Sequence, residues 1–161
     1  KWFNQQYLRK RSDEELAESF KPVLKEKGIS KSDDFLRDFV RLVKEKVQFV
    51  HEFWEQGRYV FEAPLSYDEK VLTKKWKDNS PAVFSKLIEK FSQVQDWTVE
   101  NITAAFNDSE AESGKIDMQL LRVLVTGVAG GPQLFDMLAL IGRNEVLQRL
   151  EKALAAKGQN A

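Results

Sequence analysis

The fold is decided by residues 35–54, which read FLRDFVRLVKEKVQFVHEFW. Their apolar side chains recur three or four positions apart, at Phe35, Leu36, Phe39, Val40, Val43, Val47, Val50, Phe53 and Trp54. That spacing is close to the 3.6-residue period of an α-helix that buries one face. It predicts one long helix that begins near Ser30 or Ser32 and ends at Gly57.

The neighbouring segments carry helix signals as well. Upstream, Ser12 and Glu15 have the spacing of a capping box, and Gly28 supplies a left-handed residue that ends a helix. Pro22 lies inside this stretch, so we expect it to kink the helix or to split it in two. Downstream, we interpret residues 58–64 as an extended connector, because the run is short and ends in proline.

The rest of the chain is also divided into helices by capping residues and glycines. Ser66 and Glu69 predict a capping box that opens a helix through Trp76, and Pro81 suits the first position of the next helix. The remaining signals are Thr98 as an opening residue, the turn at 113–114, and the turns at 127–132 and 142–143. We therefore expect seven to nine helices and no strand.

These elements predict an all-α fold of two small helical subdomains. Pro64 and Ser66 interrupt the helical pattern, so we expect residues 1–66 to form the first subdomain and residues 67–161 the second. The chain begins without a methionine and in the middle of a pattern. We expect it to be a fragment, with residues 1–11 as the link from a missing preceding part.

Composition excludes several classes of function. Lys and Arg number 25 and so do Asp and Glu, so the chain lacks the strongly basic balance of the simplest nucleic-acid-binding domains. Basic clusters occur at residues 1–11 and 70–77, and their spacing is typical of solvated helix faces. With no cysteine and one histidine, we expect no disulfide, thiolate nucleophile or metal site. No run of 18 apolar residues exists, so we expect a cytoplasmic protein without membrane contact.

The most unusual segment is residues 120–135, in which Arg122 interrupts an aliphatic helix that stops at the glycine-rich turn 127–131. Glycine lets a partner approach the backbone closely, and a guanidinium can stack on a base or bind its acceptor edge. The alternative is structural: Arg122 pairs with an acid such as Asp117 or Asp136, and the turn is only a helix corner.

Four segments together resemble the glutamyl-tRNA synthetases of bacterial type, over essentially the whole chain. Residues 2–8, Trp-Phe-Asn-Gln-Gln-Tyr-Leu, resemble the segment that leads from the catalytic domain into the anticodon-binding region. Residues 121–142 are similar to the family's Leu-Arg…Thr-Gly…Pro-x-Leu-Phe block, residues 147–154 to its last helix, and residues 58–61 to an aromatic connector. The first and last of these blocks in chain order are the most specific.

The resemblance implies a tRNA anticodon-binding module. It implies that Arg122 contacts the first anticodon base and that Gly131, Pro132 and Leu134 line the same pocket. At the family position that reads the third base, this chain has Lys46, which cannot reproduce the bidentate fork of arginine. Arg37, Arg41 or Lys44 then become alternative readers of that base.

The resemblance also implies that the parent protein is an ATP- and magnesium-dependent glutamate–tRNA ligase. The adenylate-binding signatures are absent from this chain, so we expect it to be inactive alone and to bind no cofactor. The expected partner is glutamate tRNA, with glutamine tRNA left open, and we expect a monomer. The alternative is a helical protein–protein interaction module that binds an amphipathic helix. Binding in such a groove would respond little to salt, whereas binding led by phosphate contacts would weaken sharply as salt is added.

Overall fold

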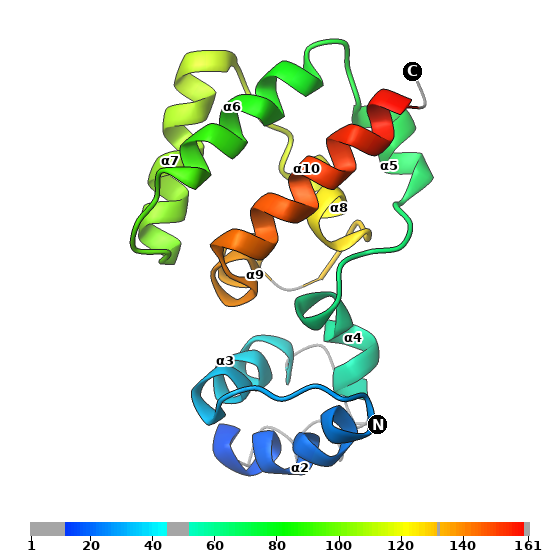
Figure 1. The fold of residues 1–161 in the computed structure, drawn as a ribbon, viewed down its shortest axis with the longest axis vertical. Helices are drawn as coiled ribbons and strands as arrows, with labels where there is room; N and C mark the ends of the chain where they lie inside the picture. The colour runs from blue at the N-terminus through cyan, green and yellow to red at the C-terminus, as the bar shows by residue number, and fades with distance from the viewer. Residues whose placement is uncertain (1–11, 45–51, 132, 160–161) are drawn as a thin grey trace. The chain divides into compact units, whose positions relative to one another are not determined.

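The computed structural model describes residues 12–44, 52–131 and 133–159. Every regular element in these ranges is a helix, which confirms the predicted all-α fold (Figure 1). The chain divides into two compact units that part between Glu62 and Ala63, with residues 131–133 grouped with the first unit. None of the helices described is both long and apolar enough to cross a membrane.

The first unit contains α2 (Asp13–Glu26), α3 (Asp33–Val43) and α4 (Glu52–Phe61). Ser12 and Ser32 cap α2 and α3, because their hydroxyls accept hydrogen bonds from the N–H groups of Glu15 and Phe35 at 3.1 Å. The capping at both positions agrees with the sequence signals. A cluster of phenylalanine rings fills the core: the ring of Phe39 lies 5.4 Å from that of Phe20 and 4.8 Å from that of Phe61.

The prediction of one long helix over residues 32–56 is wrong. A single helix would separate Phe39 from Gly57 by about 27 Å, at a rise of 1.5 Å per residue. Instead α3 and α4 pack together, and a Cβ atom on Gly57 would lie only 2.5 Å from the Phe39 ring. The apolar residues of the stripe that the structure describes therefore belong to two helices, α3 and α4, which bury their faces against each other.

Two further details of the first unit differ from the sequence expectations. Gly57 does not end a helix, and residues 58–61 are not extended, because α4 continues to Phe61. Pro22 lies inside α2 without splitting it. One missing N–H costs the helix a single hydrogen bond, and the buried side chains of Phe20 and Leu24 hold the helix on the core on both sides of the proline.

The second unit contains α5 (Glu69–Lys75), α6 (Ser80–Ser92), α7 (Val99–Ser113), α8 (Met118–Thr126), α9 (Leu134–Ile141) and α10 (Arg143–Gln159). The predicted Ser66 capping box is wrong, because Asp68 caps α5 by accepting a hydrogen bond from Val71 N at 3.1 Å. Thr98 caps α7 as expected, at 3.2 Å from Asn101 N.

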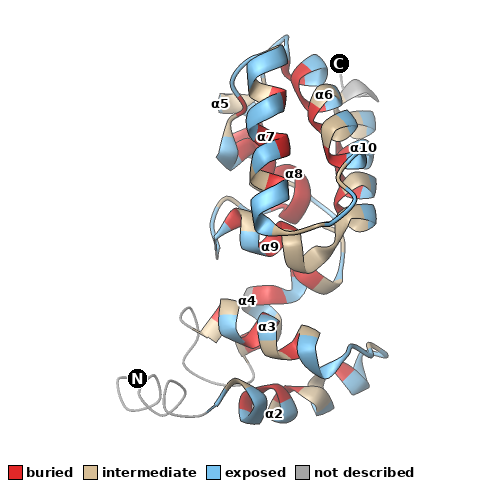
Figure 2. Ribbon diagram, turned by 90° about the vertical axis from the view of Figure 1, so that its left-hand side faces the viewer, coloured by how far each residue is buried: buried red, intermediate tan, exposed pale blue. Residues whose placement is uncertain are grey.

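The helix α10 organises the second unit by packing on α6, α8 and α9 (Figure 1). Its buried face carries Val146, Leu150 and Ala153. The turn before it is fixed by two side chains: Arg143 donates to Val94 O at 2.6 Å, and Trp97 Nε1 donates to Leu138 O at 2.7 Å. Figure 2 shows the buried residues concentrated on the inner faces of these helices, with α8 the most buried of them.

Candidate functional site

The helix α8 carries the candidate site, and its N-terminal end is fixed by Asp117. One carboxylate oxygen of Asp117 accepts a hydrogen bond from Leu120 N at 2.9 Å, and the other lies 3.0 Å from Lys75 Nζ. Burial raises the pKa of this carboxyl, but the bonds from Leu120 N and Lys75 outweigh it and leave the pKa below its usual value. Asp117 is thus a charged cap that ties α8 to α5.

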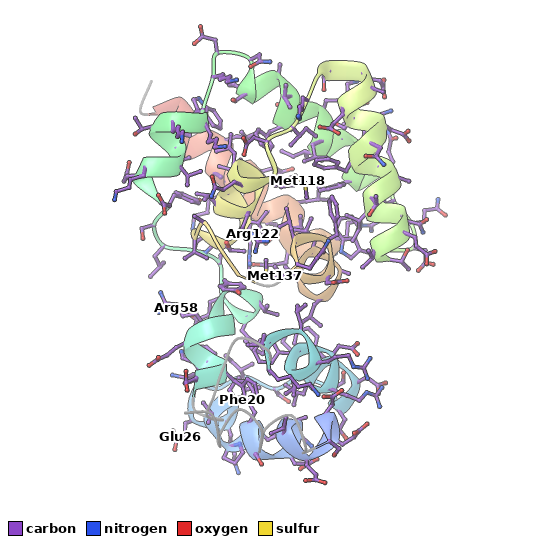
Figure 3. All side chains as sticks on the ribbon, turned by 180° about the vertical axis from the view of Figure 1, so that it is seen from behind. Phe20, Glu26, Arg58, Met118, Arg122 and Met137 are labelled. Carbon is purple, nitrogen blue, oxygen red and sulfur yellow. The ribbon has the colours of Figure 1, made fainter. Side chains whose placement is uncertain are left out.

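Arg122 lies half-buried on α8, between the buried residues Leu121 and Val123 (Figure 3). Both carboxylate oxygens of Asp117 are occupied by Leu120 N and Lys75. Asp117 is one of the two acids predicted as a structural partner of Arg122. Asp136, the other acid considered, lies exposed in the first turn of α9.

The C-terminal end of α8 is held by Thr126. Its hydroxyl oxygen lies 2.7 Å from the carbonyl oxygen of Arg122 and accepts a hydrogen bond from Val128 N at 3.3 Å. The same side chain therefore connects the turn of α8 that carries Arg122 to the chain that leaves the helix. Thr126 is buried, so this connection is sheltered from water.

Gly127 is the residue at which α8 must end, since its φ of 82° is left-handed. A Cβ atom there would lie 2.5 Å from the carbonyl oxygen of Ser66 and 2.8 Å from Pro64 Cβ. The carbonyl of Gly127 also accepts a hydrogen bond from Asp68 N at 3.0 Å. The connector before α5 is thus docked on the end of α8, and only glycine permits that approach.

The remaining predicted residues of this turn are in different situations. Gly131 is exposed, and Pro132 lies outside the described residues. Leu134 is the first residue of α9 and is only 3% exposed, so its side chain packs in the core. Val128 precedes these positions and is 43% exposed, which leaves an apolar side chain in solvent directly after the Thr126–Gly127 corner.

The second predicted position, Lys46, also lies outside the described residues. Its three alternatives take part in ion pairs of the first unit. Arg37 pairs with Asp34 at 2.9 Å, while Arg41 and Lys44 lie 3.0 Å and 2.7 Å from the two carboxylate oxygens of Asp13. The pairs with Asp13 join α3 to α2, so these two cations have a structural role there.

Sequence reasoning missed Arg149 on α10. This guanidinium is 2% exposed, yet it donates a hydrogen bond to Glu145 Oε1 at 3.0 Å and another to Val125 O at 3.3 Å. Burial lowers the pKa of Arg149, and the bond to Glu145 opposes that shift. The only sequence signal was an arginine directly before a leucine and four residues after a glutamate.

The arrangement is suited to binding. Among residues 12–44, 52–131 and 133–159, no group of three or more His, Asp or Glu side chains is placed to hold a metal ion. The site offers instead a guanidinium on a fixed helix, a glycine corner and an exposed apolar residue. Such groups can contact the edge and the face of an unstacked base and the backbone of its nucleotide.

Comparison with known proteins gives a consistent result. Residues 15–154 match the model of a family described as "Anticodon binding domain". The chain is 43% identical over 159 residues to a glutamate–tRNA ligase of Flavobacterium psychrophilum, covering 96% of this chain and 31% of that protein. It is 41% identical over 160 residues to the corresponding ligase of Flavobacterium johnsoniae, covering 97% of this chain and 32% of the ligase.

A solved structure shows the same fold. The crystal structure of a glutamate tRNA ligase from Elizabethkingia meningosepticum, in complex with its amino acid, matches with a TM-score of 0.89 and 32% identity. The match covers 96% of this chain and 31% of that one. The chain thus spans about a third of the length of the proteins it resembles.

Proposed function

The chain belongs to the anticodon-binding domain family, and we propose that it holds the anticodon loop of a glutamate tRNA within a glutamate–tRNA ligase. The observation that carries this proposal is the match of the family model to residues 15–154, which include α8 and its glycine corner. The family match gives no support to the alternative, a module that binds an amphipathic protein helix.

In this function Arg122 contacts the first anticodon base. The bases of a single-stranded loop can unstack, so their hydrogen-bonding edges are open to a side chain. A planar guanidinium on a buried helix can form two parallel hydrogen bonds to such an edge. Gly131, Pro132 and Leu134 follow the corner, and we propose that this segment, mainly through its backbone, shapes the same pocket.

Lys46 is our proposal for the contact with the third anticodon base. An ammonium group is a point charge and discriminates less sharply between bases than an arginine fork does. Arg41 and Lys44 already bind Asp13. A change of either residue would therefore disturb the packing of α2 on α3 as well as any contact with RNA.

The chemical step would belong to the rest of the ligase. We propose that the complete protein joins glutamate to its tRNA with ATP and magnesium, that both bind outside this chain, and that the chain alone is inactive. The adenylate-binding signatures absent from residues 1–161 are the basis for that assignment. A cytoplasmic location and a monomeric state are parts of the same proposal, and glutamine tRNA is a further candidate partner.

The test is binding of the 161-residue chain to the anticodon stem-loop of glutamate tRNA and to a stem-loop with another first anticodon base. Three variants accompany the wild type. Arg122→Ala removes the guanidinium, Arg122→Lys keeps the charge without the fork, and Lys152→Ala removes an exposed cation elsewhere on the second unit. Thermal unfolding of each variant checks that the fold is retained.

We expect the wild type and Lys152→Ala to prefer the glutamate loop, and Arg122→Ala to bind both loops equally. A specific base contact contributes about 1–3 kcal/mol of discrimination. Arg122→Lys should retain binding but lose most of the preference. Equal binding of both loops by the wild type would contradict the proposal, and so would a preference that survives Arg122→Ala in a folded protein.

A further inference from the structure

The second unit has a hollow at the N-terminal end of α8, away from the corner that carries the predicted base contacts. Its volume is about 450 Å³. It is formed by the end of α5, the start of α6 and the segment before α8, with Val83, Phe84 and Leu120 as its buried floor. The polar residues that line it are Lys74, Lys75, Lys77, Asn79, Ser80, Lys115 and Asp117.

The charge of this hollow is strongly positive, although the formal net charge of the chain is zero. Four lysines and one aspartate line it, and Asp117 lies 3.0 Å from the Lys75 ammonium. The other three, Lys74, Lys77 and Lys115, are exposed and form no ion pair within the part of the chain that the structure describes. Three ammonium groups around one concavity repel each other, so an anion there lowers the electrostatic energy.

The walls of the hollow are fixed by hydrogen bonds at two points. Lys77 N donates to the Ser80 hydroxyl at 2.8 Å, and Ser80 N donates back to Lys77 O at 3.0 Å. On the other side, Ile116 N donates to Glu110 Oε2 at 2.8 Å, which positions the residue that follows Lys115. The backbone that carries the lysines is thus held in place before an anion binds, so binding costs little backbone entropy.

We infer that this hollow binds the phosphate backbone of the RNA whose bases lie at the other end of α8. The inference rests on the proposed function, because it supplies the RNA. Asp117 and Arg122 are five residues apart on α8, which is about 7.5 Å along a helix axis. The inference requires one RNA loop to contact the hollow and the Arg122 site together.

Lysine side chains are suited to attracting phosphate groups and less suited to reading a base, which is the role proposed for Arg122. An ammonium group on a flexible stem attracts a phosphate oxygen from many directions and reads no base edge. The hollow would hold the loop in place without regard to sequence, while Arg122 would discriminate between bases. The two sites thus differ in what they contribute: the hollow contributes salt-dependent affinity, and Arg122 contributes preference.

The test compares two triple variants of the 161-residue chain. Lys74→Gln, Lys77→Gln and Lys115→Gln together remove three of the four ammonium groups that line the hollow. The matched control is Lys25→Gln, Lys70→Gln and Lys152→Gln, which removes the same charge from exposed positions that do not line the hollow. Binding to the glutamate and altered anticodon stem-loops is measured across a series of salt concentrations, after thermal unfolding has confirmed the fold.

We expect the hollow variant to bind both loops roughly ten-fold more weakly at low salt, with a flatter dependence on salt. Each lost phosphate contact on single-stranded RNA lowers the slope of log K against log salt by about 0.7, so three lost contacts lower it by about 2. The control triple should keep a slope close to that of the wild type. Any base preference of the wild type should survive in the hollow variant.

An equal slope for the hollow and control variants would overturn the inference, even where the wild type prefers the glutamate loop. A flatter slope without any base preference in the wild type would support the hollow and contradict the proposed function. A separate measurement tests whether the hollow binds a free phosphate compound. If inorganic phosphate or ATP stabilises the wild type but not the hollow variant, and the RNA slopes agree, the hollow serves a free phosphate and the inference is wrong.

Discussion

Arg149 on α10 donates a hydrogen bond from Nη1 to the backbone carbonyl of Val125 on α8, over 3.3 Å. Val125 is in the last turn of α8, where carbonyl groups have no partner within the helix and a cation is favourable. The guanidinium is held in turn by Glu145, at 3.0 Å from its Nε. A buried arginine thus fixes the end of the helix that carries Arg122.

Replacement of Arg149 by methionine should lower the free energy of unfolding by about 2–4 kcal/mol, because Val125 loses its partner in a buried site. Anticodon stem-loop binding should weaken too, since the end of α8 is released. Urea unfolding and loop affinity measure the two effects. Lys152→Ala, at an exposed position of the same helix, is the control and should leave both quantities unchanged. Equal stability of Arg149→Met and wild type would contradict the role assigned to Arg149.

Gly127→Ala should lower the free energy of unfolding by more than the strain of a left-handed φ accounts for. The new Cβ would meet the carbonyl oxygen of Ser66 at 2.5 Å, and backbone cannot move aside as a flexible side chain can. We expect a loss of about 3 kcal/mol or more in urea unfolding, combining strain of 1–2 kcal/mol with the clash.

The matched control for that prediction is Gly142→Ala. Gly142 has a φ of 100° but open space around its Cβ position, so only the backbone strain should remain. A loss of about 1–2 kcal/mol is expected there. If both variants lose the same stability, the docking of the connector on α8 contributes nothing measurable.

Local signals in the sequence predicted the helix starts well. Ser12, Ser32 and Thr98 each cap a helix by accepting a hydrogen bond from a nearby N–H, as their positions before apolar runs indicated. The Ser66 prediction was wrong because Asp68 stands two residues later and is also a good cap. The bond from Asp68 N to Gly127 O is a tertiary contact that residues 60–70 cannot reveal.

The candidate site was predictable only where its residues are contiguous. Arg122 and the glycine corner are close in sequence, so their association could be predicted, while their contacts with anticodon bases stay a prediction. The bond from Arg149 to Val125 depends on α10 packing on α8. The lysine hollow joins Lys74 and Lys77 to Lys115 from a distant segment, and in sequence each group is indistinguishable from a solvated helix face.

Gly57→Ala should destabilise the first unit, although alanine normally favours a helix over glycine. Gly57 lies inside α4, where propensity alone would add about 0.8–1 kcal/mol of stability. The Cβ would lie 2.5 Å from the Phe39 ring, and we expect overpacking of about 1–3 kcal/mol to outweigh that gain. Gly130→Ala, with no atom within 4 Å of its Cβ position, is the neutral control. A Gly57→Ala variant more stable than wild type would contradict the close packing of α3 on α4.

Asp13 should make the first unit sensitive to acid. Burial raises the pKa of this carboxyl, but hydrogen bonds from Lys44 and Arg41 outweigh it, so the folded pKa lies below the usual 3.8. At pH values near 3.8 the unfolded chain binds more protons than the folded one, and stability therefore rises with pH through this range. The contribution of Asp13 is complete above 3.8 and is lost as the pH falls through the lower, folded pKa.

The measurement is the urea stability of wild type and Asp13→Asn from pH 7 down to pH 2. At neutral pH the variant should be less stable, because Lys44 and Arg41 lose the charge that joins α3 to α2. The difference should shrink only below pH 3.8, as wild-type Asp13 itself becomes protonated. A difference that stays constant to pH 2 would show that the loss at pH 7 comes from the shape of the side chain, and that the ion pairs with Asp13 add nothing.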